Sequence, residues 1–288
     1  MSDTPQKDTI TACIDGSNMG ASIVDAAAWV SANLGAPLQL LHVIERDQLP
    51  EGDRSGSLGP DSASHLLDEL TDLDEKRGKV AMALGKHMLQ EAQSRATAAG
   101  VTDISLHQRH GDLLDALQDV EERTRVYVIG RLGTDHENHT QAMGAHLESL
   151  VRSLHTPILV SVGDFSGPKS YMLAYDGSAG ADRAIASIAD TAVLKSMTGH
   201  VVMVGGDKPA HQSALERAGQ LLKDHGHSIQ THSLQGNIVE ALLEFRRSQN
   251  VELTVMGAYG HSRVLEFFVG SNTSRMIRAS EVPLLLLR

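Results

Sequence analysis

A glycine-rich loop near the C-terminus is the part of this 288-residue sequence best suited to chemistry. It contains Gly257, Gly260 and Gly270, and Ser271 and Asn272 follow directly. Glycines after a strand allow positive φ and let the backbone approach a ligand closely, while the first amides of a following helix are unsatisfied donors. Phosphate oxygens suit these amides, and the helix dipole favours their negative charge. The pattern therefore predicts a phosphate-binding loop.

Polar side chains around the loop support the same chemistry. Ser271 and Thr273 offer hydroxyl groups, and His261 and Arg263 can supply a hydrogen bond or positive charge. The loop is not followed by the Gly-Lys-Ser/Thr of a Walker A motif, and residues 251–288 contain no lysine. Without that lysine, and with no obvious general base nearby, the loop favours phosphate binding over phosphoryl transfer.

An acidic turn earlier in the same half provides a second candidate group. Asp176, Gly177 and Ser178 end a short aliphatic run. In a doubly wound sheet, the strand before them can lie beside the strand before Gly257, so that both turns face one crevice. Asp176 could then accept hydrogen bonds from a ribose or an adenine amine. Its alternative role is that of an ordinary turn or cap residue.

These two features belong to a pattern that occurs twice along the chain. Three landmarks recur in the same order in each half, which makes coincidence unlikely and indicates an internal repeat. They are TACIDGS at 11–17 with MLAYDGS at 172–178, the stretch 110–130 with 235–257, and HTPILV at 155–160 with EVPLLLL at 281–287.

Short aliphatic runs alternate with longer amphipathic ones in both halves, as parallel sheets with crossover helices require. Asp112 and Asn237 each precede an apolar-periodic run and are expected to be helix N-caps, and Ser271 is expected to begin the last helix. We predict strands near 8–14, 37–45, 103–108, 125–130 and 157–162, then near 170–175, 200–205, 228–233, 251–257 and 283–287.

The fold class that follows is α/β, with two tandem doubly wound, Rossmann-like domains. Each is expected to hold a five-stranded parallel sheet with four helices divided between its two faces. Domain 1 is assigned to residues 1–162 and domain 2 to 168–288, because residues 161–170 are rich in Gly, Ser, Asp and Pro.

The first half carries a large insertion at 46–99, which begins with turn-rich sequence and continues as a helix from about 65 to 99. Apolar residues recur along one face of this helix at three- and four-residue spacing. They are Leu66, Leu70, Leu73, Val80, Leu84 and Met88. Two interpretations remain open: a helix that overhangs the sheet with a solvated outer face, or a contact arm for another subunit or partner.

Composition excludes several classes of partner. Acidic residues outnumber basic ones 36 to 25, giving a formal charge of −11, which argues against binding nucleic acid or anionic lipid. Residues 1–9 lack the apolar stretch of a signal peptide, and no run approaches the roughly 20 apolar residues that span a bilayer. We expect a cytoplasmic protein that does not insert into membranes.

Cysteine and histidine usage gives no sign of a metal site. Cys13 is the only cysteine, so no internal disulfide can form, and a buried, unreactive thiol is expected. Two histidine clusters lack the tight ligand spacing of a zinc site. They are His136, His139 and His146 in the first half, and His225, His227 and His232 in the second.

Taken together, these residues resemble the universal stress protein family in its tandem form, over nearly the whole sequence. The resemblance rests on IDGS and YDGS, on G-x2-G-x9-G-S from Gly257 to Ser271, and on the closing strands PILV and PLLLL. It implies an adenine nucleotide alpha-hydrolase-like fold that binds ATP, with or without Mg²⁺. It also implies that strands at 157–162 and 283–287 pair antiparallel across a pseudo-twofold axis.

The resemblance also assigns roles to individual residues of the second half. Asp176 would meet the adenosine part of the nucleotide, and Val204 would contact adenine through its backbone. The remaining candidates would hold the ribose and phosphates. They are Gly177, Gly257, Gly260, His261, Arg263, Gly270, Ser271 and Asn272.

The first half departs from this pattern. Gly130 and Gly133 are present, but Gly144 comes one residue late and is followed by Ala145 and His146 in place of Ser and Asn. The extra residue shifts the expected helix start relative to the loop, and the lost hydroxyl removes a phosphate donor. We therefore expect nucleotide in the second half and a weakened or empty site in the first.

The favoured function is an ATP-responsive stress or signalling protein that acts through an unidentified protein partner and hydrolyses ATP slowly at most. Intramolecular pairing of the two domains is expected, and a homodimer is left open. One alternative is a slow nucleotide-dependent hydrolase or transferase. Another is a structural dimerisation module with vestigial nucleotide sites.

Overall fold

The computed structural model describes residues 8–17, 19–45, 60–131, 140–205, 209–258 and 271–287. In the first half, strands and helices alternate. They are β1 (Thr9–Cys13), α1 (Gly20–Leu34), β2 (Leu38–Ile44), α2 (Pro60–Ala98), β3 (Ile104–His110), α3 (Leu113–Gln118), β4 (Thr124–Gly130), α4 (Thr140–Ser153) and β5 (Ile158–Ser161).

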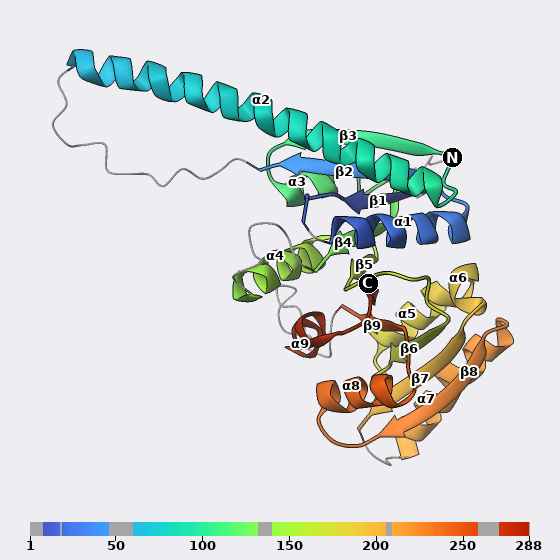
Figure 1. Ribbon diagram of the computed structural model, residues 1–288. Helices are drawn as coiled ribbons and strands as arrows, with labels where there is room; N and C mark the ends of the chain where they lie inside the picture. The colour runs from blue at the N-terminus through green and yellow to red at the C-terminus, as the bar shows by residue number, and fades with distance from the viewer. Residues whose placement is uncertain are drawn as a thin grey trace, which may run out of the picture.

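The second half repeats this alternation (Figure 1). Its elements are β6 (Ser170–Ala174), α5 (Ala179–Ala189), α6 (Ala192–Lys195), β7 (Thr198–Val204), α7 (Pro209–Asp224), β8 (Ser228–Leu234), α8 (Ile238–Ser248), β9 (Leu253–Gly257), α9 (Ser271–Ala279) and β10 (Leu284–Leu287). The ten strands predicted from sequence are all present. The expectation of four helices in this half was wrong, because the one-turn helix α6 is added between α5 and β7, where Val193 and Leu194 enter the core.

The strands form one ten-stranded sheet in the order β3-β2-β1-β4-β5-β10-β9-β6-β7-β8. Within each half all neighbouring strands are parallel. The halves meet through β5 and β10, which pair antiparallel with Leu285 opposite Leu159. This confirms both the tandem α/β architecture and the predicted pairing of the two closing strands, which covers two aliphatic sheet edges.

Two hydrophobic cores lie on opposite faces of the sheet, and each extends through both halves. One contains Ile23 of α1, Leu89 of α2 and Ile185 of α5. The other contains Leu150 of α4 and Leu242 of α8. The helices therefore cover both faces, as parallel sheets require.

Side-chain caps fix where several helices begin. Asp112 accepts hydrogen bonds from the backbone N–H groups of Leu114 and Asp115, and Asn237 accepts one from Val239. Both predicted N-caps are confirmed. Because these helices follow β3 and β8 directly, the caps set the position at which each chain leaves the carboxyl edge of the sheet.

Among the described helices and strands, α2 alone extends far from the sheet (Figure 1). It begins at Pro60, a few residues before the predicted start. Its C-terminal part packs against α1, β2 and β3, and Arg95 forms a bidentate ion pair with Asp25 of α1. None of the described helices combines the length and apolar character needed to cross a membrane.

Candidate functional site

The candidate site lies at the carboxyl edge of β6, β7 and β9. The strands β6 and β9 are adjacent and parallel, with Ala174 opposite Met256, and Ala174 also lies opposite Val202 of β7. The predicted adjacency of these two strands is confirmed. The turn after β6, which holds Asp176, and the end of β9 at Gly257 consequently face the same edge, where ligands of doubly wound sheets bind.

A cavity of about 250 Å³ opens at this edge. Its floor is apolar and comes from the three strands and α8, whereas its rim is polar and comes from the turns and the start of α9. The lining residues are Ala174, Tyr175, Asp176, Ser178, Ala181, Val202, Val204, Ile238, Leu242, Met256, Gly257, Asn272 and Thr273. An apolar hollow with a few convergent polar groups is typical of a small-molecule site.

Asp176 has the turn role that was considered for it. Its Oδ1 accepts a hydrogen bond from the backbone N–H of Ser178 at 3.0 Å, so it shapes the turn. Gly177 has φ of 74°, a left-handed conformation that favours glycine. Ser178 in turn caps α5 by accepting from the N–H of Ala181. The turn therefore holds Asp176 at the edge of the cavity.

The start of α9 forms the opposite side of the rim. The helix begins at Ser271, as the sequence predicts. Thr273 is buried, and its hydroxyl donates to the carbonyl oxygen of Gly257 at 3.4 Å. This contact ties the first turn of α9 to the end of β9. It brings Asn272, which also lines the cavity, to the same side as Gly257.

The structure thus gathers four predicted site residues around one cavity, namely Asp176, Val204, Gly257 and Asn272. Gly177 lies in the turn beside them, and Ser271 begins α9. The other candidates, Gly260, His261, Arg263 and Gly270, lie outside the described residues, as does most of the expected phosphate loop. The described cavity therefore includes only part of the predicted set of site residues.

Sequence reasoning missed the apolar residues of the cavity. Ile238, Leu242 and Met256 follow the periodicity of ordinary core residues, so no sequence signal separates them from the core. Tyr175 was also missed. It is buried, and its hydroxyl donates to Oδ1 of Asp182 at 2.5 Å. Burial raises the pKa of Tyr175, which keeps this hydroxyl protonated.

The corresponding edge of the first half is crowded by α1. A Cβ atom placed on Gly130, the counterpart of Gly257, would lie 2.9 Å from Cδ1 of Ile23 and 3.3 Å from Cβ of Met19. Aligning the two DGS turns places Gly180 opposite Met19 and Ala184 opposite Ile23. The first half therefore has large side chains where the second has small ones.

The helix after β4 does not follow the glycine pattern. A glycine pattern like that of the second half, where Ser271 follows Gly270, would start this helix after Gly144, but α4 begins at Thr140, so Gly144, Ala145 and His146 lie inside the helix. The segment Gln141–Met143 consists of residues with good helix propensity, which allows the earlier start. Gly133, His136 and His139 lie outside the described residues.

The histidines of the second cluster have different partners. Buried His227 hydrogen-bonds the Tyr171 hydroxyl and the carbonyl oxygen of Ala189. His232 instead pairs with His200, with 3.1 Å between Nε2 and Nδ1. Within the described part of the chain, no group of three or more His, Cys, Asp or Glu residues is placed to hold a metal ion.

The single cysteine has the environment of a core residue. Cys13 is buried in β1, and burial together with the nearby Asp15 raises the pKa of its thiol to about 12. A thiol with this pKa carries little thiolate near neutral pH, so its nucleophilicity is low.

Comparisons with known proteins agree with this architecture. The model of the universal stress protein family matches residues 7–161 and 169–288. A universal stress protein of Synechocystis sp. (strain ATCC 27184 / PCC 6803 / Kazusa) is 28% identical over 284 residues, covering 97% of this chain and 99% of its own.

Solved structures show the same fold at lower identity. A universal stress protein from Archaeoglobus fulgidus DSM 4304 aligns with a TM-score of 0.69 and 20% identity, over 98% of this chain and 97% of its own. A functionally unknown protein from Pseudomonas aeruginosa PAO1 aligns with a TM-score of 0.60 and 15% identity, over 97% and 92%.

Proposed function

The chain belongs to the universal stress protein family, and we propose from this premise that it is an ATP-binding stress-response or signalling protein with its nucleotide in the C-terminal half. One observation carries the proposal. The cavity at the carboxyl edge of β6, β7 and β9 is bordered by Asp176, Val204, Gly257 and Asn272, four of the residues to which the family resemblance assigns nucleotide contacts. We assign these residues, with the rest of the predicted set, to the nucleotide site.

The chemistry of the lining fits the adenosine end of ATP. Val202, Leu242 and Met256 provide an apolar floor on which a planar base can lie, and partly exposed Ile238 stands at the margin. Burying a base against such a surface is favourable because apolar area leaves water. Asp176 on the rim is a hydrogen-bond acceptor for ribose hydroxyls or an adenine amine.

The phosphates would extend from the rim toward residues 258–270 and the start of α9. In this arrangement, the first N–H groups of α9 and the side chain of Asn272 supply donors, and the helix dipole favours the negative charge. A Mg²⁺ ion, if it accompanies ATP, would be held mainly by the phosphates, as is usual for this cation.

We propose binding, not metabolic turnover, as the role of the site. Among the residues that line the cavity, Asp176 is the only carboxylate, and it is engaged in the turn that shapes the rim. Binding a phosphate in its ground state without a positioned nucleophile gives little catalysis. ATP hydrolysis should therefore be slow at most.

Signalling would follow from a nucleotide-dependent change at the surface. Phosphate contacts would favour one conformation of residues 258–270, and a protein partner that prefers this conformation would bind the ATP form more tightly. The proposal includes a cytoplasmic location, where ATP is supplied.

Thermal unfolding with and without ATP tests the proposal. Protein first shown to be free of retained nucleotide is heated with millimolar ATP and MgCl₂. Ligand at one hundred times its dissociation constant stabilises the folded state by about 2.7 kcal/mol, so a clear rise in Tm is expected. Calorimetric titration should then give one site per chain. An unchanged Tm, or two equivalent sites per chain, would contradict the proposal.

A further inference from the structure

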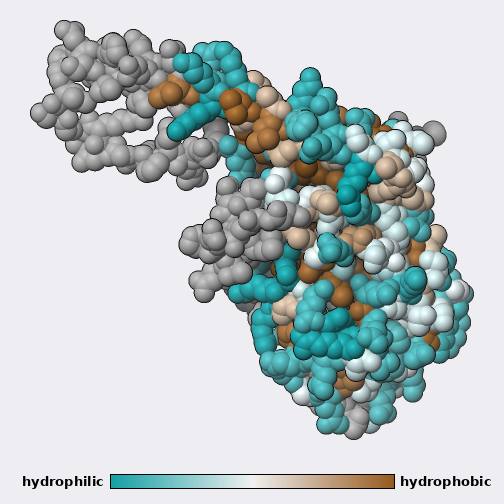
Figure 2. Space-filling view, in the orientation of Figure 1, coloured by the Kyte–Doolittle hydropathy of each residue, from teal (hydrophilic) through white to brown (hydrophobic). Residues whose placement is uncertain are grey.

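Helix α2 carries an exposed apolar stripe, defined here as Leu73, Val80 and Leu84. Their exposed fractions are 52%, 67% and 56%, unusually large for aliphatic side chains. With Met82, they account for four of the seven exposed large hydrophobic residues in the described chain. Figure 2 shows hydrophobic surface along this projecting part of the molecule. Such a concentration on one element indicates an interaction surface.

The stripe does not face the body of the protein. The buried face of α2 begins at Gly85 and continues through Leu89, Ala92 and Ala96. One residue in a helix corresponds to a rotation of about 100°, so the face that holds Leu84 is turned well away from the face that holds Gly85. The stripe therefore remains available after α2 has packed on the sheet.

The spacing of the stripe is that of a coiled-coil seam. Val80 follows Leu73 by seven residues, and Leu84 follows Val80 by four. Leu66 and Leu70 extend the same alternation of threes and fours toward the N-terminus of α2. Apolar residues at this spacing form the seam between paired helices. Arg77 occupies the one seam position that is not apolar, and a polar residue there limits which partner and alignment are acceptable.

We propose that the stripe binds a second copy of this chain, with the two α2 helices antiparallel. The distribution of charge along α2 favours a second, antiparallel copy as the partner. Residues 61–75 contain six acidic and no basic residues, whereas residues 76–86 contain four basic and no acidic residues. An antiparallel copy places each half of the helix against the oppositely charged half of its partner. A parallel copy would place like charges together, which is unfavourable.

Other occupants fit less well. The preceding segment, residues 46–59, is rich in glycine, serine and charge and has only Leu49 and Leu58 as large aliphatic residues, too few to cover the stripe. An acidic peptide would complement only the basic part of α2. A second copy complements both parts and supplies an identical apolar stripe, as a twofold interface requires.

The mass of the full chain in solution tests the proposal. Sedimentation across a wide concentration range should show a monomer–dimer equilibrium. The variant Val80→Glu/Leu84→Glu should raise the dimer dissociation constant at least about a hundredfold, because two charges per copy enter the seam. Leu221→Glu, at an exposed apolar position on α7, should leave the constant unchanged. Unaltered circular dichroism would show that α2 remains folded.

A charge exchange tests the antiparallel alignment. Lys76→Glu/Lys79→Glu makes this part of α2 acidic in both copies and should weaken the dimer at low salt. Adding Asp72→Lys and Asp74→Lys to the same chain should restore it, since opposite charges again face each other. A wild-type chain that stays monomeric at every concentration would overturn the proposal, and so would a dimer insensitive to charge at Val80 and Leu84. Failure of the exchange to restore the dimer would overturn the antiparallel alignment.

Discussion

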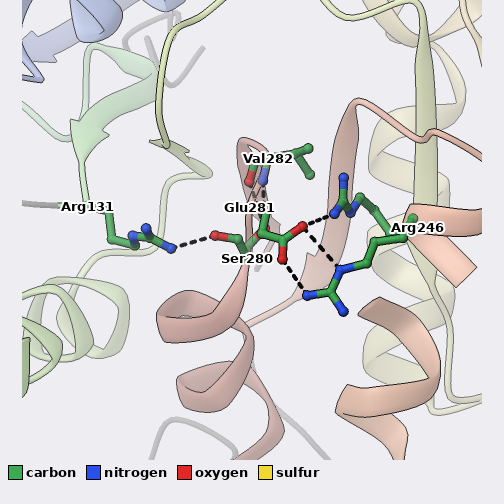
Figure 3. A network of polar contacts seen from close by, with 6 residues as sticks. Arg131, Arg246, Ser280, Glu281 and Val282 are labelled. Atoms are coloured by element: carbon green, nitrogen blue, oxygen red, sulfur yellow. Dashed lines mark hydrogen bonds and ion pairs between the residues drawn. The ribbon is translucent and has the colours of Figure 1, made fainter. Parts of the chain in front are cut away.

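Arg131, which follows β4 directly, donates a hydrogen bond to the backbone carbonyl oxygen of Ser280, 2.5 Å away, and so joins the two halves (Figure 3). It also donates to the carbonyl of Arg278 at 3.3 Å. These carbonyls lie at the C-terminal end of α9, where helix carbonyls lack intrahelical partners and positive charge is favourable. The first half of the chain thus holds the far end of the helix whose start borders the cavity.

Replacing Arg131 should weaken the contact between the two halves of the chain. Arg131→Met keeps the aliphatic stem but removes both hydrogen bonds, and we expect the free energy of unfolding to fall by roughly 1.5 kcal/mol. Partial burial lowers the pKa of the guanidinium and shows that its desolvation opposes the gain, so a larger loss is not expected. Urea denaturation measures the change. Arg125→Met, at an exposed position of β4, should have little effect, and equal losses in both variants would refute the assigned role.

Asp176 offers a test of the proposed nucleotide site with a matched control inside the same chain. Asp15 makes the same turn in the first half, with Oδ1 accepting from the N–H of Ser17 at 3.0 Å. Asp176→Ala should weaken ATP binding roughly tenfold to a hundredfold, since a hydrogen bond to a charged group is lost.

Asp15→Ala removes an equivalent turn hydrogen bond and should leave ATP affinity unchanged. Calorimetric titration of both variants separates a ligand contact by Asp176 from its turn hydrogen bond. If the two variants lose affinity equally, Asp176 does not act as a ligand contact.

Much of this fold could be predicted because local signals determine it. The aliphatic runs of the strands, the caps Asp112 and Asn237 and the helix start at Ser271 all depend on residues near in sequence. The repeat of the DGS turn indicated which strands lead to the site. The start of α4 does not follow the glycine pattern, because the residues before Gly144 have good helix propensity.

The shape of the site could not be predicted in the same way. Leu242 and Met256 have the apolar character of any core residue, and only the packing of α8 against the strands makes them a cavity floor. The crowding of Gly130 by Met19 and Ile23 likewise depends on how α1 settles on β4. Such contacts arise between segments far apart in sequence, where periodicity gives no information.

The side chains that crowd Gly130 in the first half suggest a substitution that would block the cavity in the second half. Gly180 occupies the position equivalent to Met19, and a Cβ there would meet only ordinary contacts, 3.6 Å from Oγ of Ser178 and 3.9 Å from Nη2 of Arg183. Gly180→Met should therefore fold, and helix propensity favours it. Its side chain should reach over the end of β9, as Met19 does over β4, and lower ATP affinity at least about tenfold.

Ala186→Met provides the control for Gly180→Met, because Ala186 is exposed on the same helix. It adds the same side chain away from the cavity and should leave ATP affinity unchanged. Thermal unfolding of both variants without nucleotide checks the fold. Full affinity in Gly180→Met would mean that the methionine of the first half does not determine the difference between the two halves.

The paired histidines His200 and His232 should make stability depend on pH. Their rings approach at 3.1 Å between nitrogens and pack on Phe245. Burial lowers the pKa of both, and for His200 the neighbouring His232 lowers it further. In the unfolded chain each titrates near its ordinary pKa of about 6.5, so protons bind the unfolded state more readily. The stability contributed by these groups is present above that value and is lost as pH falls through the lowered pKa of the folded state.

Urea denaturation at pH 8 and pH 5.5 should therefore show a smaller free energy of unfolding at the lower pH. His232→Gln removes one titrating ring and its repulsion of protonated His200. The difference in the free energy of unfolding between pH 8 and pH 5.5 should therefore shrink. His225→Gln is the control, because His225 is exposed at the end of α7; its pH difference should match that of the wild type. If His232→Gln keeps the full pH difference, the acid sensitivity originates outside this pair.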